Sequence, residues 1–333
     1  MGAPLTKQDF MSNQEVRWCP GCGDYAVLAA IQKTLPDLGI SREKIVFISG
    51  IGCSSRFPYY MNTFGFHTIH GRAPALATGL ALARPDLSIW VITGDGDALS
   101  IGGNHLIHAM RRNVNINILL FNNETYGLTK GQYSPTSHRD TISKSTPYGS
   151  LDEPFSAINV ALGAGASFVA RTYDRDQKHM GEIFKRATQH RGTSFVEIYQ
   201  NCVIFNDGVH EETVGKNVRE TNALFLKAGE PLTFGKDHAK GLCISHYQPE
   251  IKDVNADDAD ICVHREDLEH PAYASLLGSL RNPEYPEPMG VFRAINRAVY
   301  EDEVQKQMDQ VIASKGSGSI QELLHHGETW EIR

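Results

Sequence analysis

The stretch LSIWVITGDGD, Leu87–Asp97, decides the fold expected for this chain of 333 residues. Its first seven residues are almost continuously apolar, which is typical of a strand that is buried on both faces of a parallel sheet. The turn GDGD follows, then a helical pattern, and then a second apolar strand, NINILLFNN (115–123). This alternation predicts an α/β fold with a mostly parallel sheet and helices on both faces.

The same alternation continues on both sides of these two strands. Helices are expected over 24–38, 71–85, 155–162 and 177–190, and strands over 44–49, 166–173 and 193–202. Beyond about residue 206 the chain is polar and irregular, apart from a helical pattern over 291–313 and a short final helix after SKGSGS (314–319). We therefore expect an N-terminal segment 1–22, an α/β domain 23–206 and a C-terminal extension 207–333 that packs on a partner.

Composition limits the classes of function. The chain is 41% hydrophobic and 21% charged, as in soluble globular proteins, and its net charge is −7 with no cluster of Lys and Arg. This distribution argues against binding to nucleic acid. No apolar run is long enough to span a membrane and the N-terminus lacks the apolar core of a signal peptide, so a cytoplasmic protein without membrane contact is expected.

Polar residues follow the two central strands directly. Gly94, Asp95 and Gly96 come after the first strand, and Asn122 and Asn123 end the second. Because parallel strands end at one edge of a sheet, both turns should build one site there. Glycines let backbone N–H groups approach phosphate, while carboxylate and amide oxygens suit Mg²⁺. The sequence has neither the P-loop motif nor the GxGxxG motif, so a different type of diphosphate site is expected.

The cysteines allow several interpretations. Cys19 and Cys22 form a Cys-x-x-Cys pair in WCPGCG (18–23), which alone could be a redox dithiol, part of a zinc or iron–sulfur site, or a structural pair. Cys53 lies in the turn after the first strand, and Cys202 ends the last strong strand. The sheet edge can therefore bring four thiols together, and four thiolates suit either Zn²⁺ or a 4Fe–4S cluster.

The pairing of GDG with NN resembles the thiamine diphosphate and Mg²⁺ motif of thiamine-dependent enzymes. This resemblance implies that Mg²⁺ is bound by Asp95, Asn123 and the backbone carbonyl of Thr125. It also implies that the cofactor is surrounded by a set of residues from both turns, namely Gly94, Gly96, Asp97, Gly127 and Leu128.

Six motifs in the same order resemble the β subunit of the 2-oxoacid:ferredoxin oxidoreductases over about residues 15–235: WCPGCG, GIGCSSR, HGRA, GDGD, NN.TYGLTKGQ.SPT and NC. The resemblance implies one 4Fe–4S cluster held by Cys19, Cys22, Cys53 and Cys202. It also implies that the thiamine cofactor is lined by Ile51, Gly52, Cys53, Ser54 and His70. From the sequence alone, the His70 side chain could instead be a core histidine.

The implied reaction is the decarboxylation of a 2-oxoacid on thiamine diphosphate, or its reverse. Coenzyme A takes the acyl group, and ferredoxin takes the electrons through the cluster. In this family the carboxylate that activates the cofactor and most of the coenzyme A site belong to an α subunit. We therefore expect two α and two β chains in the enzyme, and no activity from this chain alone.

The expected substrate is 2-oxoglutarate, because residues 50–73 resemble members of that type. Arg56 stands where other members have lysine, and its guanidinium could clamp a second carboxylate; Lys130 is another candidate. One alternative is the same chemistry on pyruvate or on many 2-oxoacids. Alternatives from other classes are a zinc-stapled scaffold or binding protein with a vestigial cofactor fold, and a thiamine-dependent decarboxylase without a cluster.

Overall fold

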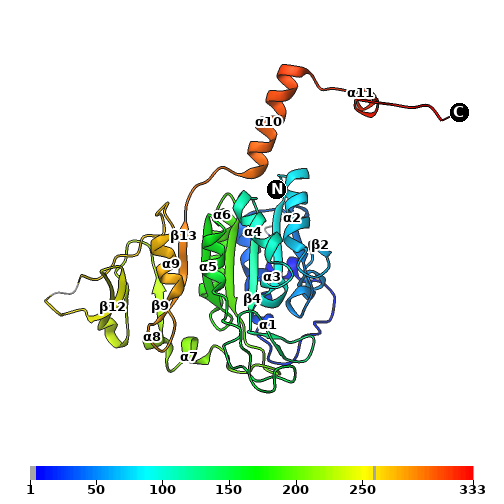
Figure 1. Ribbon diagram of the computed structural model, residues 1–333. Coiled ribbons are helices and arrows are strands. Elements are labelled where there is room, and N and C mark those ends of the chain that lie inside the picture. The colour runs from blue at the N-terminus through cyan, green and yellow to red at the C-terminus, as the bar shows by residue number, and fades with distance from the viewer. Residues whose placement is uncertain (1–4, 258–259, 333) are drawn as a thin grey trace.

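A computed structural model describes residues 5–257 and 260–332 and is built around one large sheet (Figure 1). The strand order is β2-β1-β3-β4-β8-β7-β13-β9. All neighbours are parallel except β7 and β13, so the mostly parallel α/β fold is confirmed. The strands are β1 (Ile45–Ser49), β2 (Phe64–His67), β3 (Ser88–Gly94), β4 (Asn117–Asn122), β7 (Phe168–Tyr173), β8 (Ser194–Tyr199), β9 (Ala223–Leu226) and β13 (Glu287–Ala294).

Helices cover both faces of this sheet. One face packs on α1 (Asp24–Thr34) and α6 (Gln177–Gln189), and the other on α2 (Ala73–Ala83), α4 (Gly103–Arg112) and α5 (Ala157–Gly163). Consecutive residues of β4 serve opposite faces, since Leu119 belongs to the first apolar cluster and Leu120 to the second. The continuous apolar run in the sequence therefore reflects a strand that is buried on both sides.

Apart from the helix over 300–315, the remaining elements are short. The further helices are α3 (Asp95–Leu99), α7 (Glu211–Val214), α8 (Arg219–Asn222), α9 (Ala272–Ser279), α10 (Tyr300–Lys315) and α11 (Ile320–Leu324). Two small sheets pair β5 (Thr125–Tyr126) with β6 (Gln132–Tyr133), and β10 (Thr233–Phe234) with β11 (Lys240–Ser245) and β12 (Gln248–Asp253). Each of the following ranges forms a 3₁₀ helix: Lys7–Phe10, Leu35–Leu38, Arg42–Lys44, Ser54–Tyr60 and Lys236–His238.

The C-terminal extension contributes to the central sheet. The strands β9 and β13 both lie beyond residue 206, where the sequence analysis places the end of the α/β domain, and β13 pairs directly with β7. The helix expected over 291–313 is wrong for its first residues. Val291 packs on one face of the sheet and Phe292 on the other, as alternation in a strand allows, and the helix begins only at Tyr300.

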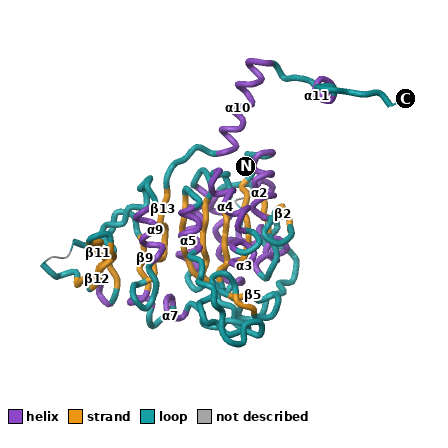
Figure 2. Tube along the Cα trace, in the orientation of Figure 1, coloured by secondary structure: helices purple, strands orange, loops and turns teal. Residues whose placement is uncertain are grey.

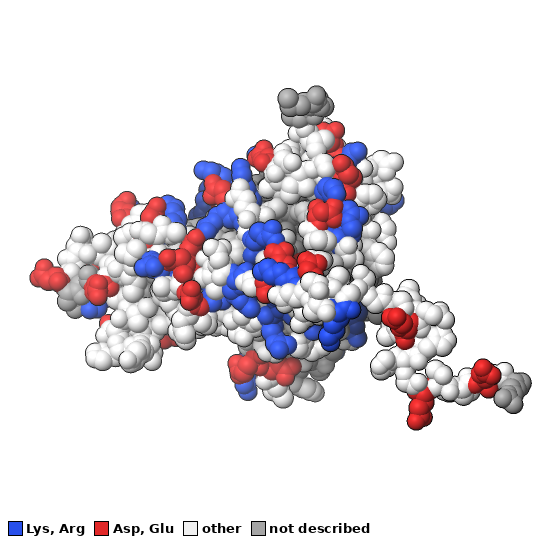
Figure 3. Space-filling view, turned by 90° about the horizontal axis from the view of Figure 1, so that it is seen from above, with Lys and Arg blue, Asp and Glu red and all other residues white. Residues whose placement is uncertain are grey.

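The last helices leave the body of the protein. Figure 1 shows α10 and α11 reaching away from the sheet, at the end opposite the loops that contain β5 in Figure 2. Parts of this arm are apolar and exposed, including Met308, Leu323 and Trp330. Figure 3, which views the end where the arm leaves, shows Lys and Arg side chains over that face with Asp and Glu side chains between them. In the described part of the chain, no helix is long and apolar enough to cross a membrane.

A buried ion-pair network joins the extension to the sheet. Arg171 on β7 is fully buried and donates to Glu197 on β8 at 2.7 Å, and it pairs with Glu287 on β13 at 3.3 Å. Glu287 also accepts from Thr213 at 2.9 Å and pairs with Arg281. Since each charge is compensated by neighbours from a different strand, the network depends on the correct position of all three strands.

We predict that Arg171→Met lowers the free energy of unfolding by about 3–5 kcal/mol, because it leaves two buried carboxylates without their shared partner. Urea denaturation followed by circular dichroism measures this change. Arg139→Met is the control, since its ion pair with Glu153 is exposed and should contribute less than about 1 kcal/mol. Equal losses in the two variants would contradict the prediction.

Candidate active site

The site is built at the carboxyl edge of four neighbouring parallel strands. In the sheet, β1, β3, β4 and β8 stand in this order, so the turns that follow them lie side by side. Gly94 at the end of β3 pairs with Phe121 of β4, and Asn122 pairs with Tyr199 of β8. The expectation that the GDG and NN turns share one edge is therefore confirmed.

These turns enclose a cavity of about 280 Å³, called the cofactor cavity here. The structure brings together on its walls all the residues that the resemblance assigns to thiamine diphosphate or Mg²⁺, namely Ile51, Gly52, Cys53, Ser54, His70, Gly94, Asp95, Gly96, Asp97, Asn123, Thr125, Gly127 and Leu128. His70 is exposed and lines this cavity, so it is not a core histidine. The contacts of these residues with a cofactor remain predictions.

The Asp97 carboxylate joins three separate segments around the cofactor cavity. Its Oδ1 accepts from the backbone N–H of Ile51 at 3.1 Å and of Gly71 at 2.8 Å. Its Oδ2 accepts from the Thr93 hydroxyl at 2.7 Å. A Cβ at Gly50 would overlap this carboxylate, so glycine is required there for the turn to approach. Asp97 therefore fixes the turn after β1 against the end of β3.

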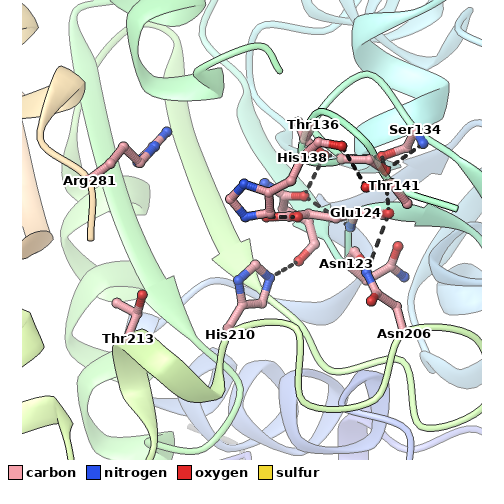
Figure 4. A network of polar contacts seen from close by, with 12 residues as sticks. Asn123, Glu124, Ser134, Thr136, His138, Thr141, Asn206, His210, Thr213 and Arg281 are labelled. Carbon is pink, nitrogen blue, oxygen red and sulfur yellow. Dashed lines mark hydrogen bonds and ion pairs between the residues drawn. The ribbon is translucent and has the colours of Figure 1, made fainter. Parts of the chain in front are cut away.

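Asp95 is held by two hydroxyl groups from the loop after β6. The hydroxyls of Ser134 and Thr136 lie 2.6 and 2.7 Å from its Oδ2, and Figure 4 shows both residues beside the loop that carries Asn123. Burial raises the pKa of Asp95, while these two hydrogen bonds oppose the rise by favouring the charged form. The arrangement suits a carboxylate that is oriented toward a cation.

The loop after β4 is held through its carbonyl groups. Asn206 donates to the carbonyl of Asn123 at 3.0 Å, the Ser137 hydroxyl donates to that of Glu124 at 2.6 Å, and a His210 ring nitrogen lies 2.9 Å from that of Asn122 (Figure 4). Glu124 has a positive φ of 53°, which non-glycine residues rarely adopt. This backbone is therefore held by its surroundings in a shape that the chain alone disfavours.

A second cavity, of about 260 Å³, adjoins the first and is called the cysteine cavity here. Cys19, Cys22, Cys53 and Cys202 all line it. The two cavities share four residues, namely Cys53, Asn123, Gly127 and Leu128. The four cysteines that the sequence analysis singles out therefore lie around one space beside the cofactor cavity.

The segment WCPGCG is attached to two strand ends. The Trp18 indole N–H donates to the carbonyl of Cys53 at 2.7 Å, and the N–H of Gly23 donates to the carbonyl of Asn201, next to Cys202, at 3.1 Å. A Cβ at Gly23 would overlap the carboxylate of Asp174. These contacts bring the N-terminal pair of cysteines to the other two.

The cysteine cavity contains four thiols, but within the described residues they do not form an arranged metal site. A Cβ placed on Gly127 would lie 3.6 Å from the sulfur of Cys53 and 3.7 Å from that of Cys202, so both sulfurs border the space that this glycine leaves open. Burial raises the pKa of Cys53 to about 11, and the pKa of Cys22 is also raised, chiefly by burial. Within residues 5–257 and 260–332, no three His, Cys, Asp or Glu side chains are arranged to hold a metal ion.

The two cationic candidates for substrate binding face the cysteine cavity. Arg56 and Lys130 both line it, and neither lines the cofactor cavity. The Arg56 side chain donates to the Tyr60 hydroxyl at 3.0 Å, which directs its guanidinium. Lys130 has a positive φ of 75° at the turn that returns the loop toward Gln132. Their contact with a substrate carboxylate stays a prediction.

Several residues of the site were missed from the sequence. Ser134 and Thr136 belong to the SPT motif, but nothing in their spacing indicates a bond to Asp95. Gln200 immediately precedes the NC motif. Its side chain contacts Asn123, which lines the cofactor cavity, and Cys22, which lines the cysteine cavity. A polar cavity of about 350 Å³ behind the β4 loop was also missed; Glu124 lines it, and burial raises the pKa of that carboxyl to about 8.

Comparisons with known proteins agree with this arrangement. A family model described as "Thiamine pyrophosphate enzyme, C-terminal TPP binding domain" matches residues 50–198. The chain is 52% identical to 2-oxoglutarate oxidoreductase subunit KorB of Mycobacterium tuberculosis, over 99% of this chain and 91% of that protein. It is 46% identical to 2-oxoacid:ferredoxin oxidoreductase 1, subunit beta, of Aeropyrum pernix, over 57% of this chain and 60% of that one.

A solved structure matches nearly the whole chain. The 2-oxoglutarate:ferredoxin oxidoreductase from Magnetococcus marinus, solved with 2-oxoglutarate, coenzyme A and succinyl-CoA bound, superimposes with a TM-score of 0.76 at 31% identity. The match covers 96% of this chain and 94% of that one. The α/β core and the cofactor cavity thus define a thiamine diphosphate-binding domain.

The similarity to the mycobacterial protein and to the solved structure extends over nearly the whole chain. It therefore identifies the family more specifically than the match to the thiamine-binding domain does. This chain belongs to the family of 2-oxoacid:ferredoxin oxidoreductase β subunits, and is therefore a subunit of an oxidoreductase. The resemblance seen in the six sequence motifs is confirmed.

We predict that Asp97→Asn lowers the free energy of unfolding by about 1–3 kcal/mol, because an amide nitrogen cannot accept one of the three buried hydrogen bonds. Chemical denaturation measures the loss. Asp140→Asn is the matched control: this side chain is exposed, and asparagine tolerates its positive φ of 66°. A loss in the control as large as in Asp97→Asn would contradict a specific role for the Asp97 carboxylate.

Proposed function

We propose that this chain is the β subunit of a 2-oxoglutarate:ferredoxin oxidoreductase. It binds thiamine diphosphate and Mg²⁺ in the cofactor cavity and one 4Fe–4S cluster in the cysteine cavity. The observation that supports this proposal best is the shared wall of the two cavities, formed in part by Cys53 and Gly127. In this proposal the one-electron acceptor lies directly beside the thiamine cofactor.

The names of the relatives support the choice of substrate. The mycobacterial protein is named a 2-oxoglutarate oxidoreductase subunit, and the solved enzyme from Magnetococcus marinus is described with 2-oxoglutarate, coenzyme A and succinyl-CoA bound. The proposed overall reaction converts 2-oxoglutarate and coenzyme A to succinyl-CoA and CO₂. Two electrons are released in it and reduce two one-electron ferredoxin centres.

In the cofactor cavity, Asp95, Asn123 and the carbonyl of Thr125 are the proposed Mg²⁺ ligands. Ser134 and Thr136 hold Asp95 in place through two short hydrogen bonds that favour its charged form. The side-chain oxygen of Asn123 accepts only a 3.2 Å bond from the N–H of Thr125 among the hydrogen bonds of the described residues. Bound thiamine diphosphate supplies a nucleophilic carbon and an electron sink for decarboxylation.

In the cysteine cavity, Cys19, Cys22, Cys53 and Cys202 are the proposed ligands of the 4Fe–4S cluster. In the free chain, burial raises the pKa of Cys22 and of Cys53 and so opposes deprotonation of these two thiols. Bound iron would reverse this preference, since metal coordination favours the thiolate. The exposed position of Cys19 leaves one side of the cavity accessible from the surface, where ferredoxin could approach.

A partner subunit has to complete the active site. Among the described residues that line the cofactor cavity, the carboxylates are Asp95 and Asp97. Asp97 is engaged in three hydrogen bonds, and Asp95 is the proposed metal ligand. The carboxylate that activates the cofactor is therefore expected from an α subunit in an assembly of two α and two β chains. The exposed apolar residues of α10 and α11 provide a surface for this assembly.

The cluster is tested by removing one ligand in the complete α/β enzyme, purified without oxygen. Cys202→Ser is expected to lose most of the roughly four irons per β chain, together with the visible absorbance, because a cluster with three cysteine ligands is less stable. Iron analysis and absorption spectroscopy measure this. Cys262→Ser is the control, since Cys262 lies in the extension and lines neither cavity.

The alternatives give different results in the same experiment. A colourless wild-type enzyme with stoichiometric zinc would support the zinc-stapled scaffold. Full turnover of Cys202→Ser without iron would support a thiamine-dependent decarboxylase that needs no cluster. Either result would refute the proposed cluster.

The choice of substrate is tested at Arg56, one of the cations that line the cysteine cavity. Arg56→Gln should raise KM for 2-oxoglutarate by about 10–100-fold, because a charge-assisted hydrogen bond to the distal carboxylate is lost, and should change KM for pyruvate much less. Arg17→Gln is the control, because Arg17 lines the same cavity and pairs with Glu15. Steady-state kinetics with both oxoacids measure the effect. A higher kcat/KM of the wild-type enzyme for pyruvate would contradict the choice of 2-oxoglutarate.

A further inference from the structure

Gln200 connects a proposed Mg²⁺ ligand to a proposed cluster ligand. The residue follows β8 directly, and only 1% of its surface is exposed. Its Oε1 accepts from the side-chain amide of Asn123 at 2.8 Å. Its Nε2 lies 3.3 Å from the sulfur of Cys22 and also donates to the carbonyl of Asn201 at 2.5 Å. A single buried amide thus contacts both sites.

The chemistry of the two amides fixes the direction of this chain of hydrogen bonds. Mg²⁺ binds oxygen and not the NH₂ group of an amide, so Asn123 must turn its oxygen toward the cation and its NH₂ toward Gln200. Gln200 must then present its oxygen to Asn123. Its NH₂ is thereby directed toward the sulfur of Cys22. The orientation required at the metal determines the hydrogen bond received by the thiol.

We propose that Gln200 is a positioning residue that orients the Asn123 oxygen for Mg²⁺ and donates a hydrogen bond to the Cys22 sulfur of the cluster. This inference rests on the proposed function, because it concerns the reduction potential of the 4Fe–4S cluster. A hydrogen bond to a ligating sulfur withdraws negative charge from the cluster and stabilises its reduced form. Gln200 therefore makes the reduction potential of the cluster more positive.

Two substitutions separate the two contacts. Gln200→Glu keeps an oxygen that can accept from Asn123 but removes the N–H donor to Cys22. Gln200→Met has a similar length and no charge, and removes both contacts. Gln189→Glu is the matched control, since this exposed residue ends α6 near the opposite edge of the sheet and receives the same change of charge.

The experiment uses the complete α/β enzyme purified without oxygen. A redox titration followed by electron paramagnetic resonance gives the reduction potential of the cluster. A titration with Mg²⁺ at saturating thiamine diphosphate, followed by calorimetry, gives the affinity for the cation. Iron content of each variant shows that the cluster is present and that the comparison concerns folded, loaded enzyme.

Gln200→Glu and Gln200→Met should differ in their affinity for Mg²⁺, while the reduction potential of the cluster should shift in the same direction in both. Both should show a more negative reduction potential than the wild type, and the shift in the uncharged Gln200→Met reports the lost hydrogen bond. Only Gln200→Met should bind Mg²⁺ about 10–100-fold more weakly, the usual cost of removing a group that orients a metal ligand. Gln189→Glu should leave both quantities unchanged.

Either of two results would overturn this role. One is an unchanged reduction potential in both loaded variants, and the other is unchanged affinity for Mg²⁺ in Gln200→Met. A wild-type enzyme without iron would instead refute the proposed function, and with it the role of Gln200 toward a cluster. The two failures are therefore distinguishable by the iron content of the wild type.

Discussion

The site depends on one buried carboxylate that holds separate strand ends together. Asp97 accepts hydrogen bonds from the backbone of Ile51 and Gly71 and from the Thr93 hydroxyl. Backbone donors are fixed in space, so a carboxylate that satisfies two of them determines where the turn after β1 lies relative to β3. The positions of Cys53 and His70 follow from this, since each lies within two residues of a donor.

The cysteines illustrate how a fold assembles a site from distant segments. Two of them follow strands of the sheet, Cys53 after β1 and Cys202 after β8, and the Asp97 carboxylate fixes the turn that carries Cys53. The other two belong to a segment with no strand of its own, which is held by the Trp18 indole and by the N–H of Gly23. A buried aromatic residue and a glycine therefore decide whether the four sulfurs meet.

Much of this arrangement could be predicted from the sequence because it rests on local patterns. Apolar runs identify strands that are buried on both faces, and residues directly after such strands must lie at one edge. This logic placed Asp95, Asn123, Cys53 and Cys202 correctly at that edge. The helical pattern over 291–313 misled, because the apolar spacing of this segment also fits a helix and its pairing with β7 is not visible in the sequence.

The parts that could not be predicted depend on contacts between residues far apart in the chain. Arg171 and Glu287 are separated by more than a hundred residues and meet only because β13 returns to the sheet. The bonds of Gln200 to Asn123 and Cys22 likewise join three segments. The spacing of residues in the sequence does not predict such long-range contacts. A buried polar residue does need a hydrogen-bond partner, and this need indicates that a contact of this kind exists.

The course of α10 has a practical consequence. This helix leaves the protein at the end opposite the loops that contain β5, while both cavities lie at the carboxyl edge where β5 follows β4 (Figures 1 and 2). A fluorophore placed on an exposed residue of α10, such as Gln310, would be remote from both cavities. Its emission would report on contact of this helix with a partner subunit without disturbing the carboxyl edge.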